Sequence, residues 1–250
     1  MDARKEQGSL LQIQGLAKAF GGLQVIHNLT FSLNQGETLG VIGPNGSGKT
    51  TLFNLISGFI KPDAGCVDFL GRDITRRKPS SICKSGISRT FQLVKPFPQL
   101  TALENVMAGR SYGRKPAKNI KEARKEAVEM LDFMGLVNKQ MIIAEKLNLI
   151  DRKRLEIARA LATKPVLLML DEVFAGLNPS EVEEALALIQ KIRKLGITLM
   201  IVEHVMKVIL GVSTRVIVLS YGGKIFEGLP CEALNDGKVI EAYLGEDFHA

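Results

Sequence analysis

The sequence has little cysteine and no long hydrophobic run, and each absence excludes a class of protein. The longest apolar stretch, near 166–170, has the length of a strand, far below the roughly 18 residues of a membrane span. The cysteines Cys66, Cys83 and Cys231 are isolated and lack CxxC spacing, which favours reduced thiols over a disulfide or metal framework. The opening segment MDARKEQGSL has no apolar signal core, so we expect no secretion.

Low-complexity segments and internal repeats are also missing, which excludes disordered and collagen-like classes. The composition is that of a globular protein, with 46% hydrophobic and 24% charged residues. A length of 250 residues allows one large domain or two small ones, with a substantial buried core.

The positive charge is concentrated in one segment. The chain carries 33 basic and 26 acidic residues, a net charge of +7, which raises the possibility of a nucleic-acid or anionic-membrane partner. Within 110–125 a single acid, Glu122, stands against these basic residues: Arg110, Arg114, Lys115, Lys118, Lys121, Arg124 and Lys125. A solvated helix face is the simpler interpretation, and contact with an anionic membrane surface is the alternative.

Apolar runs alternate with helical patterns along much of the chain, which predicts an α/β fold. Strands are expected at 37–42, 165–170, 196–202 and 215–219, and helices at 49–59, 152–162 and 179–195. Between about 101 and 164 only helices are expected, and one apolar face recurs at steps of three and four through Ile120, Ala123, Ala127, Met130, Leu131 and Met134. The Gly-Gly pair within 221–229 predicts a late hairpin.

A glycine loop, GPNGSGKT at 43–50, matches the phosphate-binding pattern GxxxxGK[ST] in full. Its glycines let backbone N–H groups turn toward a phosphate, and the N-terminus of the following helix adds a positive dipole. Lys49 would supply a charge for the β- and γ-phosphates, and the Thr50 hydroxyl would be an oxygen ligand for Mg²⁺. A glycine-rich turn without a ligand is the alternative, but the predicted strand and helix on either side favour a nucleotide site.

Two acidic residues close the buried strand predicted at 165–170. Because successive strand residues point to opposite faces, adjacent carboxylates can take different roles. Asp171 would hold the water shell of Mg²⁺, and Glu172 would polarise the attacking water as a general base. Alone, such a pair would only mark the end of a strand; together with a phosphate loop it indicates ATP hydrolysis.

With these two motifs the chain resembles the ATP-binding cassette of ABC transporters over nearly its whole length. The resemblance implies a P-loop NTPase core of α/β class, with a mainly parallel sheet, an antiparallel β portion and an inserted helical subdomain. It implies one ABC ATPase domain over 1–250, with the nucleotide-binding core in 1–92 and 165–250 and the helical subdomain in about 93–164. The implied cofactors are ATP and Mg²⁺, and the implied activity is ATP hydrolysis coupled to transmembrane transport.

The resemblance also implies roles for single residues. Phe20, before a Gly-Gly pair, matches the aromatic residue that stacks on adenine, although a lone Phe is often an ordinary core or turn residue. Gln92, in RTFQ, matches the glutamine that touches Mg²⁺ and water, and His204 matches the switch histidine that reads the γ-phosphate. The implied catalytic residues are Glu172, His204, Gln92 and Lys49, and the implied metal ligands are Thr50, Gln92 and Asp171. The implied nucleotide contacts are Phe20, Gly43, Pro44, Asn45, Gly46, Ser47, Gly48, Lys49, Thr50 and Thr51.

One motif departs from the family pattern. The sequence LNLID at 147–151 stands where the family has LSGGQ, which normally contacts the γ-phosphate held by the other cassette of a dimer. Ile150 brings a β-branched side chain where close backbone approach is needed, and we expect Asp151 to face phosphate and cap the following helix. Asn148 could still donate one hydrogen bond. Asn178 likewise stands where many cassettes have aspartate.

Secondary motifs are similar to those of the larger ATP-binding subunit of branched-chain amino acid importers. They are FGGL at 20–23, RTFQ at 89–92, GLNP at 176–179 and VIEAYLG at 239–245. This resemblance implies a second, unlike cassette as heterodimer partner, two transmembrane permease subunits and a substrate-binding protein acting through the complex. The expected location is the cytoplasmic face of the inner (plasma) membrane, as a peripheral subunit.

Other interpretations stay open at the level of sequence. A urea or amide importer and lipopolysaccharide export share much of the motif pattern. An ATP-gated clamp with little turnover is possible because of the altered segment at 147–151, although Glu172 favours hydrolysis. An ABC factor acting on ribosomes or DNA would need tandem cassettes or long insertions, for which 250 residues leave no room, so no nucleic-acid partner is expected.

Overall fold

The computed structural model of this chain describes residues 9–92, 95–203 and 206–247. The chain divides into two compact units, a first unit of Met1–Lys78 with Thr198–Ala250 and a second unit of Pro79–Ile197. The predicted boundary of a helical subdomain at about 93–164 is a different division and stays a prediction.

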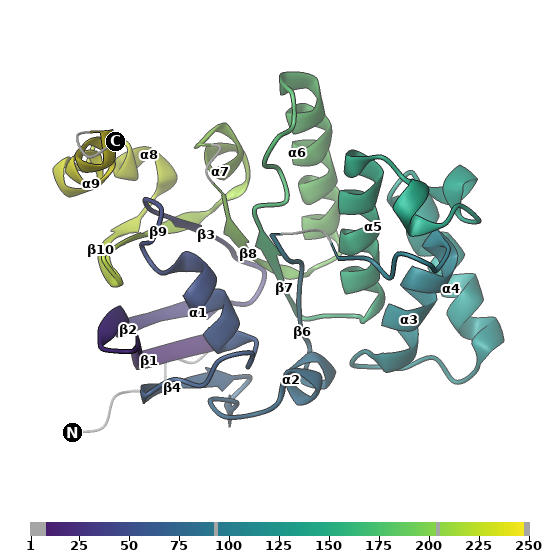
Figure 1. Cartoon of the computed structure of the whole chain (residues 1–250), viewed down its shortest axis with the longest axis horizontal. Helices are drawn as coiled ribbons and strands as arrows, with labels where there is room; N and C mark the ends of the chain where they lie inside the picture. Colours follow the sequence, from purple (N-terminus) through teal and green to yellow (C-terminus); the bar gives the residue numbers. More distant parts are fainter. Residues whose placement is uncertain (1–8, 93–94, 204–205, 248–250) are drawn as a thin grey trace. The chain divides into compact units, whose positions relative to one another are not determined.

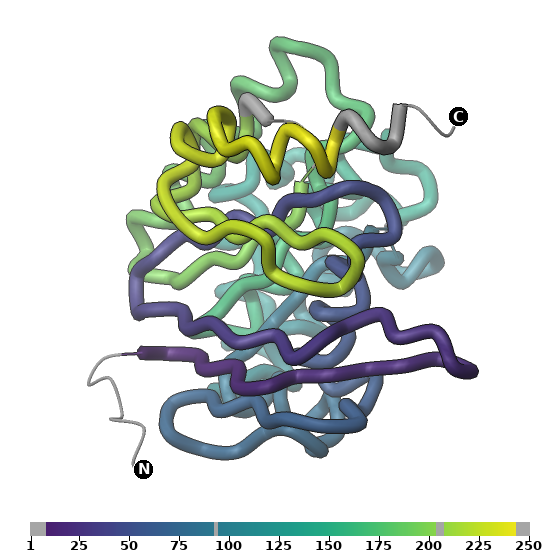
Figure 2. The backbone as a smooth tube through the Cα atoms, turned by 90° about the vertical axis from the view of Figure 1, so that its left-hand side faces the viewer, coloured from purple at the N-terminus to yellow at the C-terminus, as the bar shows by residue number. Residues whose placement is uncertain are grey.

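The first unit contains an antiparallel sheet with the strand order β2-β1-β4-β5. Its strands are β1 (Ser9–Phe20), β2 (Leu23–Asn34), β4 (Ala64–Phe69) and β5 (Arg72–Asp73). The two long strands β1 and β2 lie side by side in Figure 2 and pair through the register Phe20↔Leu23. Gly21 and Gly22 form the turn between them with positive φ values of 53° and 96°. This sheet supplies the predicted antiparallel portion of the fold.

A second group of strands in the first unit is mainly parallel. The strand β3 (Thr38–Ile42) pairs in parallel with β8 (Thr198–Val202) and β9 (Arg215–Ser220). Every residue of β3 and β8 is buried, as a strand covered on both faces requires. The hairpin predicted at 221–229 is confirmed, because β9 pairs antiparallel with β10 (Gly223–Gly228).

The helices of the first unit are α1 (Lys49–Ile56), α7 (Met206–Val212), α8 (Pro230–Ala233) and α9 (Gly237–Asp247) (Figure 1). The predicted helix 49–59 is too long at its C-terminal end. Ser57 is the C-cap, and Gly58 has a φ of 75°, a left-handed conformation typical of the position just after a helix.

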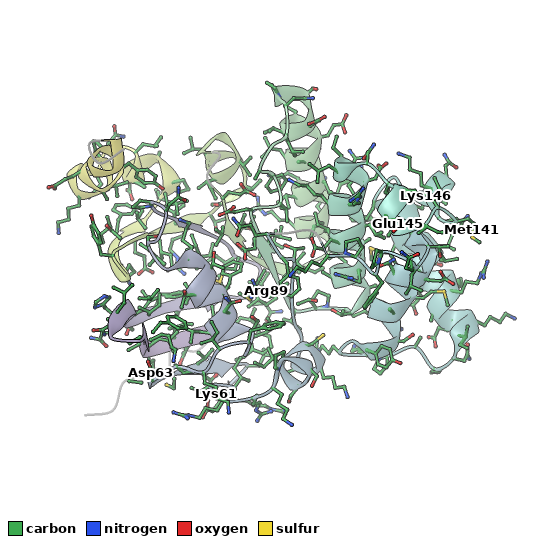
Figure 3. The ribbon with its side chains drawn as sticks, in the orientation of Figure 1. Lys61, Asp63, Arg89, Met141, Glu145 and Lys146 are labelled. Atoms are coloured by element: carbon green, nitrogen blue, oxygen red, sulfur yellow. The ribbon has the colours of Figure 1, made fainter. Side chains whose placement is uncertain are left out.

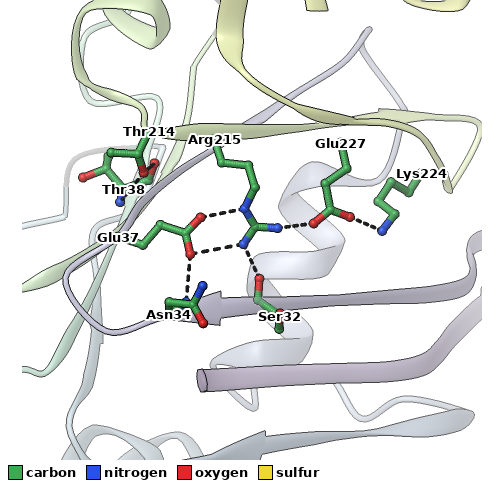
Figure 4. Close-up of polar contacts among 8 residues, drawn as sticks. All are labelled: Ser32, Asn34, Glu37, Thr38, Thr214, Arg215, Lys224 and Glu227. Carbon is green, nitrogen blue, oxygen red and sulfur yellow. Dashed lines mark hydrogen bonds and ion pairs between the residues drawn. The ribbon is translucent and has the colours of Figure 1, made fainter. Parts of the chain in front are cut away.

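Arg215 at the start of β9 joins several segments of the first unit (Figure 4). Its guanidinium donates from Nε to Glu37 Oε1 at 2.6 Å and from Nη2 to the Ser32 carbonyl at 2.5 Å. It also pairs with Glu227 of β10, which in turn pairs with Lys224. Burial alone would lower the pKa of Arg215, but its hydrogen bond to Glu37 and the two negative charges raise that pKa above the ordinary value.

The second unit combines a parallel strand pair with helices. The strands β6 (Ile87–Arg89) and β7 (Leu167–Asp171) pair in parallel, and all of β7 is buried. The helices are α2 (Pro79–Ser85), α3 (Ala102–Tyr112), α4 (Ile120–Phe133), α5 (Leu149–Ala162) and α6 (Pro179–Lys194), with short 3-10 turns at Val137–Lys139 and Ala144–Lys146. The helices α3, α4 and α5 pack against one another, and the α/β class predicted for the chain is confirmed.

The apolar face predicted for α4 is buried at its centre. Ala123, Ala127 and Leu131 lie in the core, and Met134 directly after the helix is buried too. Ile120 does not belong to this face, because it is the first helical residue and is 78% exposed.

Three findings concern membrane spans, cysteines and metal clusters in the described residues. Among the helices of the described ranges, none has both the length and the hydrophobicity to cross a membrane. Cys66, Cys83 and Cys231 are all unpaired. No group of three or more His, Cys, Asp or Glu side chains in this part of the chain is arranged to hold a metal ion.

Candidate functional site: a phosphate loop and a carboxylate cluster

The phosphate loop at 43–50 connects β3 to α1 and adopts a backbone that requires glycine. Gly43, Gly46 and Gly48 have φ values of 146°, 73° and 104°. A Cβ atom on Gly43 would lie 2.1 Å from the Leu219 carbonyl oxygen, and one on Gly48 would lie 2.9 Å from the Val25 carbonyl oxygen. Because neither backbone atom can withdraw easily, the glycines are needed for packing as well as for conformation.

The polar groups of this loop fit a phosphate. The helix α1 begins after Gly48 with no side-chain cap, so its first N–H groups keep their positive dipole available for an anion. The Ser47 hydroxyl is buried and has no hydrogen-bond partner within the described residues. Lys49 is 5% exposed, and its Nζ donates to the carbonyl oxygens of Gly43 and Pro44 at 2.7 Å each. The loop therefore offers a cation, an unpartnered hydroxyl and a helix N-terminus in one segment.

Several other predicted nucleotide contacts of the first unit are accessible, although Pro44 is buried. Asn45, Gly46 and Thr50 are exposed, and Thr51 is partly exposed. Phe20 ends β1 with 46% of its surface exposed, and the Lys18 ammonium lies 5.3 Å from the centre of its ring. Phe20 is therefore not an ordinary core residue, and its ring offers a face on which a base could stack.

In the second unit, Asp171 ends β7 and is held by an arginine that was not among the predicted site residues. The side chain of Asp171 is 1% exposed, and Arg89 Nη2 lies 3.0 Å from its Oδ2. Burial lowers the pKa of Arg89, and the charge and hydrogen bond of Asp171 oppose that shift. Arg89, labelled in Figure 3, is the last residue of β6, next to the strand that carries Asp171. Only the pairing of β6 with β7 could have indicated this partnership.

Glu172 follows Asp171 in a conformation that few residues other than glycine adopt. Its φ is 50°, which costs a residue with a Cβ about 1–2 kcal/mol. Gln92 Nε2 donates a hydrogen bond to Glu172 Oε2 at 2.7 Å. The structure thus brings together two of the predicted catalytic residues, Gln92 and Glu172, beside the predicted metal ligand Asp171. His204, another of the four predicted catalytic residues, lies outside the described residues.

The expectation that Asp151 caps α5 is wrong. Asn148 is the N-cap, and its Oδ1 accepts a hydrogen bond from the Asp151 N–H at 2.8 Å. Asp151 lies in the first turn of the helix and forms an ion pair with Lys139, so its charge is compensated within the chain. The error arose because Asn and Asp are equally good caps, and their positions in LNLID do not decide between them.

Asn178 has a similar capping function at the start of α6. Its Oδ1 accepts from the Glu181 N–H at 3.0 Å, and the Glu181 carboxylate accepts from the Asn178 N–H at 2.8 Å. This reciprocal pair is a capping box. Asparagine and aspartate serve equally well as caps, so the departure from the family pattern at this position preserves the local structure.

The basic residues of segment 110–125 differ in exposure: one is buried and the others lie on the surface. Arg110 is 4% exposed and forms an ion pair with Glu126 at 2.7 Å, which lowers the pKa of Glu126 to about 2. Lys164 is a further partner of the same carboxylate, at 2.7 Å. The remaining basic residues are exposed, and they are Arg114, Lys115, Lys118, Lys121, Arg124 and Lys125. Arg110 therefore contributes to packing between α3 and α4 rather than to a surface charge.

Comparison with known proteins places these features in a family. Residues 26–175 match the protein family described as ABC transporter. The high-affinity branched-chain amino acid transport ATP-binding protein LivG of Salmonella typhimurium is 38% identical over 95% of this chain and 98% of its own length. BraF of Pseudomonas aeruginosa, which carries the same description, is 34% identical over the same shares. A crystal structure of the ADP conformation of an ATP-binding cassette of an ABC transporter has a TM-score of 0.86 and 34% identity, over 95% of this chain and 99% of that one.

Proposed function

Because the chain belongs to the ABC transporter family and is an ATP-hydrolysing component of it, we propose that it energises an importer of branched-chain or related amino acids. One observation carries this proposal. Relatives that are named as branched-chain amino acid transport ATP-binding proteins align over 95% of this chain and 98% of their own length. Two of the four motifs that resemble this subfamily, RTFQ and GLNP, contain Gln92 and Asn178, whose side chains have defined partners.

In this proposal the phosphate loop binds the nucleotide. The α1 N-terminus and the Ser47 hydroxyl would receive phosphate oxygens, and the Lys49 ammonium would exchange its two carbonyl partners for the β- and γ-phosphates. The exposed ring of Phe20 would stack on adenine. The Ser47 hydroxyl has unfilled hydrogen-bonding capacity within the described residues, and the Phe20 ring has the exposure that its proposed role requires.

The carboxylate cluster would carry the hydrolysis step. Glu172 would take a proton from the attacking water as general base, and the hydrogen bond from Gln92 would fix the direction of its carboxylate. Mg²⁺, when bound, would neutralise charge on the phosphate oxygens. Thr50, Gln92 and Asp171 offer the oxygen ligands that this ion prefers, and His204 is proposed to sense the γ-phosphate.

We further propose that the chain works at the cytoplasmic face of the inner (plasma) membrane as one half of a cassette heterodimer. Its partners would be an unlike cassette, two permease subunits and a substrate-binding protein acting through the complex. An unlike partner suits the segment 147–151, where Leu149 is 53% exposed at the place of a family serine-glycine-glycine run. The site that uses Lys49 and Glu172 would hydrolyse ATP, and the site that uses 148–151 would be weak or silent.

Reconstitution tests the proposed solute. The chain is assembled with its cognate membrane subunits and binding protein, and phosphate release is measured with a panel of branched-chain amino acids, other amino acids, urea and amides. We expect branched-chain amino acids to stimulate turnover most strongly. Stimulation by urea or amides alone, or by lipopolysaccharide with a matching membrane partner, would replace this solute assignment.

Two variants test the catalytic and dimer proposals, the first in the same complex and the second in a homodimer of this chain. Glu172→Gln should reduce phosphate release by about 100-fold or more while ATP binding persists, because general-base catalysis contributes about that much. Equal turnover in both proteins would identify an ATP-gated clamp. Restoring Ser, Gly and Gly at 148–150 should raise turnover of a homodimer of this chain, and an unchanged rate would refute the weak-site proposal.

A further inference from the structure

A buried carboxylate on α5 holds the backbone next to Gln92. Glu156 is 2% exposed, and its Oε1 accepts a hydrogen bond from the Phe91 N–H at 3.2 Å. Gln92, the next residue, donates its side-chain hydrogen bond to Glu172. Burying an acidic side chain is unfavourable unless it is paired, so a glutamate in this position needs a reason other than core packing.

The charged groups that face Glu156 come from several elements. Arg159, one turn further along α5, lies 3.8 Å from Glu156 Oε1, and Arg89 of β6 adds a second positive charge while paired with Asp171 of β7. The Lys95 backbone N–H also favours the ionised carboxylate. Burial outweighs these partners and raises the pKa of Glu156 to about 7. Both protonation states are therefore populated near neutral pH.

The same arginines contact the segment around Gln92 through aromatic rings. The Arg89 guanidinium lies 4.8 Å from the centre of the Phe91 ring, and the Arg159 guanidinium lies 5.2 Å from that of Phe97. Further along, the fully buried Asn105 of α3 accepts from the Phe97 N–H at 2.8 Å. The backbone on both sides of Gln92 is thus attached to buried polar groups of α3 and α5.

We propose that Glu156 is a positioning residue for ATP hydrolysis, which fixes through the Phe91 N–H the backbone from which Gln92 reaches Glu172. The proposal rests on the roles proposed above for Gln92 and Glu172. Since α5 begins at the segment 147–151, the same helix connects that segment to Gln92. An ionised carboxylate is a stronger acceptor than a neutral one, so turnover rises as Glu156 ionises.

Two substitutions separate this role from a purely structural one. Glu156→Gln keeps the size and one oxygen acceptor but has no charge, and Glu156→Ala removes the acceptor. Glu129→Gln on α4 is the matched control, because that carboxylate is 62% exposed and its ion pair with Lys125 spans 3.9 Å. We would measure kcat and KM for ATP in the transporter complex between pH 6 and 8, and hydrogen exchange of the Phe91 amide in the isolated chain.

The alanine variant is expected to lower kcat about tenfold with KM for ATP changed less than about twofold, and to accelerate Phe91 amide exchange about tenfold. The glutamine variant should fall between wild type and alanine, and its kcat should lose the rise around pH 7 that wild type and Glu129→Gln retain. Wild-type kcat in both variants would overturn the proposal, as would a glutamine variant with the wild-type pH profile. If the alanine variant does not fold, the pH profile of the glutamine variant decides. Both readouts are independent of which solute the transporter carries.

Discussion

At the scale of single residues, the site depends on side chains and glycines whose neighbours come from distant parts of the sequence. The sequence identified Gly43 by its place in a motif, but the reason for glycine is the Leu219 carbonyl on β9. Likewise Gln92 and Glu172 were predicted separately, and the fold joins them by a hydrogen bond. Arg89 and Glu156 were not predicted as site residues, because a lone Arg or Glu in a sequence carries no sign of burial.

Gly43→Ala is expected to destabilise the chain severely. The new Cβ would lie 2.1 Å from the Leu219 carbonyl oxygen at a φ of 146°, so the loop or β9 must shift, at a cost of about 3 kcal/mol or more. Gly36→Ala is the matched control, since its φ is 76° but no atom lies within 4 Å of the added Cβ. Urea unfolding should show a loss of only about 1–2 kcal/mol for the control. Equal losses in the two variants would contradict the steric argument.

Glu156 should make folding stability depend on pH. Its pKa is raised from 4.5 to about 7 in the folded chain, so the folded state binds more protons than the unfolded state between these values. The contribution of this proton binding to the free energy of unfolding is complete below about pH 4.5 and is lost as the pH rises through 7. The loss is at most about 3 kcal/mol. In Glu156→Gln this contribution is absent. Between pH 5 and 8 the wild type should therefore lose unfolding free energy relative to the variant. A constant difference would show that burial does not perturb this group.

At the scale of elements, the sequence predicted whether a segment is a helix or a strand better than it predicted where that segment begins and ends. The strand at 165–170 and the helix at 179–195 were placed within two residues, because apolar runs and a Pro after an Asn cap are strong signals. The helix predicted at 152–162 begins three residues earlier, since Asn148 rather than Asp151 caps it. The predicted face of α4 is buried at Ala123, Ala127 and Leu131, whereas Met130 is partly exposed and Ile120, in the first turn, is exposed.

Arg215→Met tests the network that connects β2, β9 and β10 in the first unit (Figure 4). The substitution removes the two hydrogen bonds that Arg215 donates to Glu37. It also leaves Glu227 with Lys224 as its remaining ion-pair partner. The pair is partly buried, with 22% of the Arg215 side chain and 12% of the Glu37 side chain exposed, so removing one partner costs about 1–3 kcal/mol, because the remaining charge is uncompensated. Chemical denaturation should show this loss, and Arg152→Met, which removes hydrogen bonds to the Leu147 and Glu145 carbonyls, is a comparison without an ion pair. Equal effects of the two substitutions would refute a role for charge pairing.

At the scale of the whole molecule, net charge is a poor guide to function until the fold distributes it. Of the seven basic residues in 110–125, Arg110 is buried in an ion pair with Glu126, and the other six are exposed. The exposed segment also displays Tyr112 and Ile120, which are 76% and 78% exposed. Basic residues beside exposed apolar ones are typical of surfaces that contact anionic lipid.

Neutralising four exposed cations, Arg114, Lys115, Lys118 and Lys121, to glutamine should weaken binding of the chain to vesicles that contain anionic lipid. Each charge near such a surface contributes up to about 1 kcal/mol at low salt, so the loss should be large and should disappear at high salt. Neutral vesicles and the variant Lys191→Gln with Lys194→Gln, on the last turns of α6, serve as controls. Unchanged vesicle binding would leave the segment as a solvated helix face.

The sequence by itself determined the family, the phosphate loop and the general-base candidate, because these depend on residue types at fixed short spacings. The buried parallel strand at 165–170 also followed from a continuous apolar run, whereas the antiparallel portion of the fold was implied only by the family resemblance. Only the tertiary structure decided which groups are buried and paired: Arg89 with Asp171, Glu156 with the Phe91 amide, and Asp151 with Lys139. These contacts join residues from different elements, and the energy of a buried charge is set by neighbours that no local pattern records.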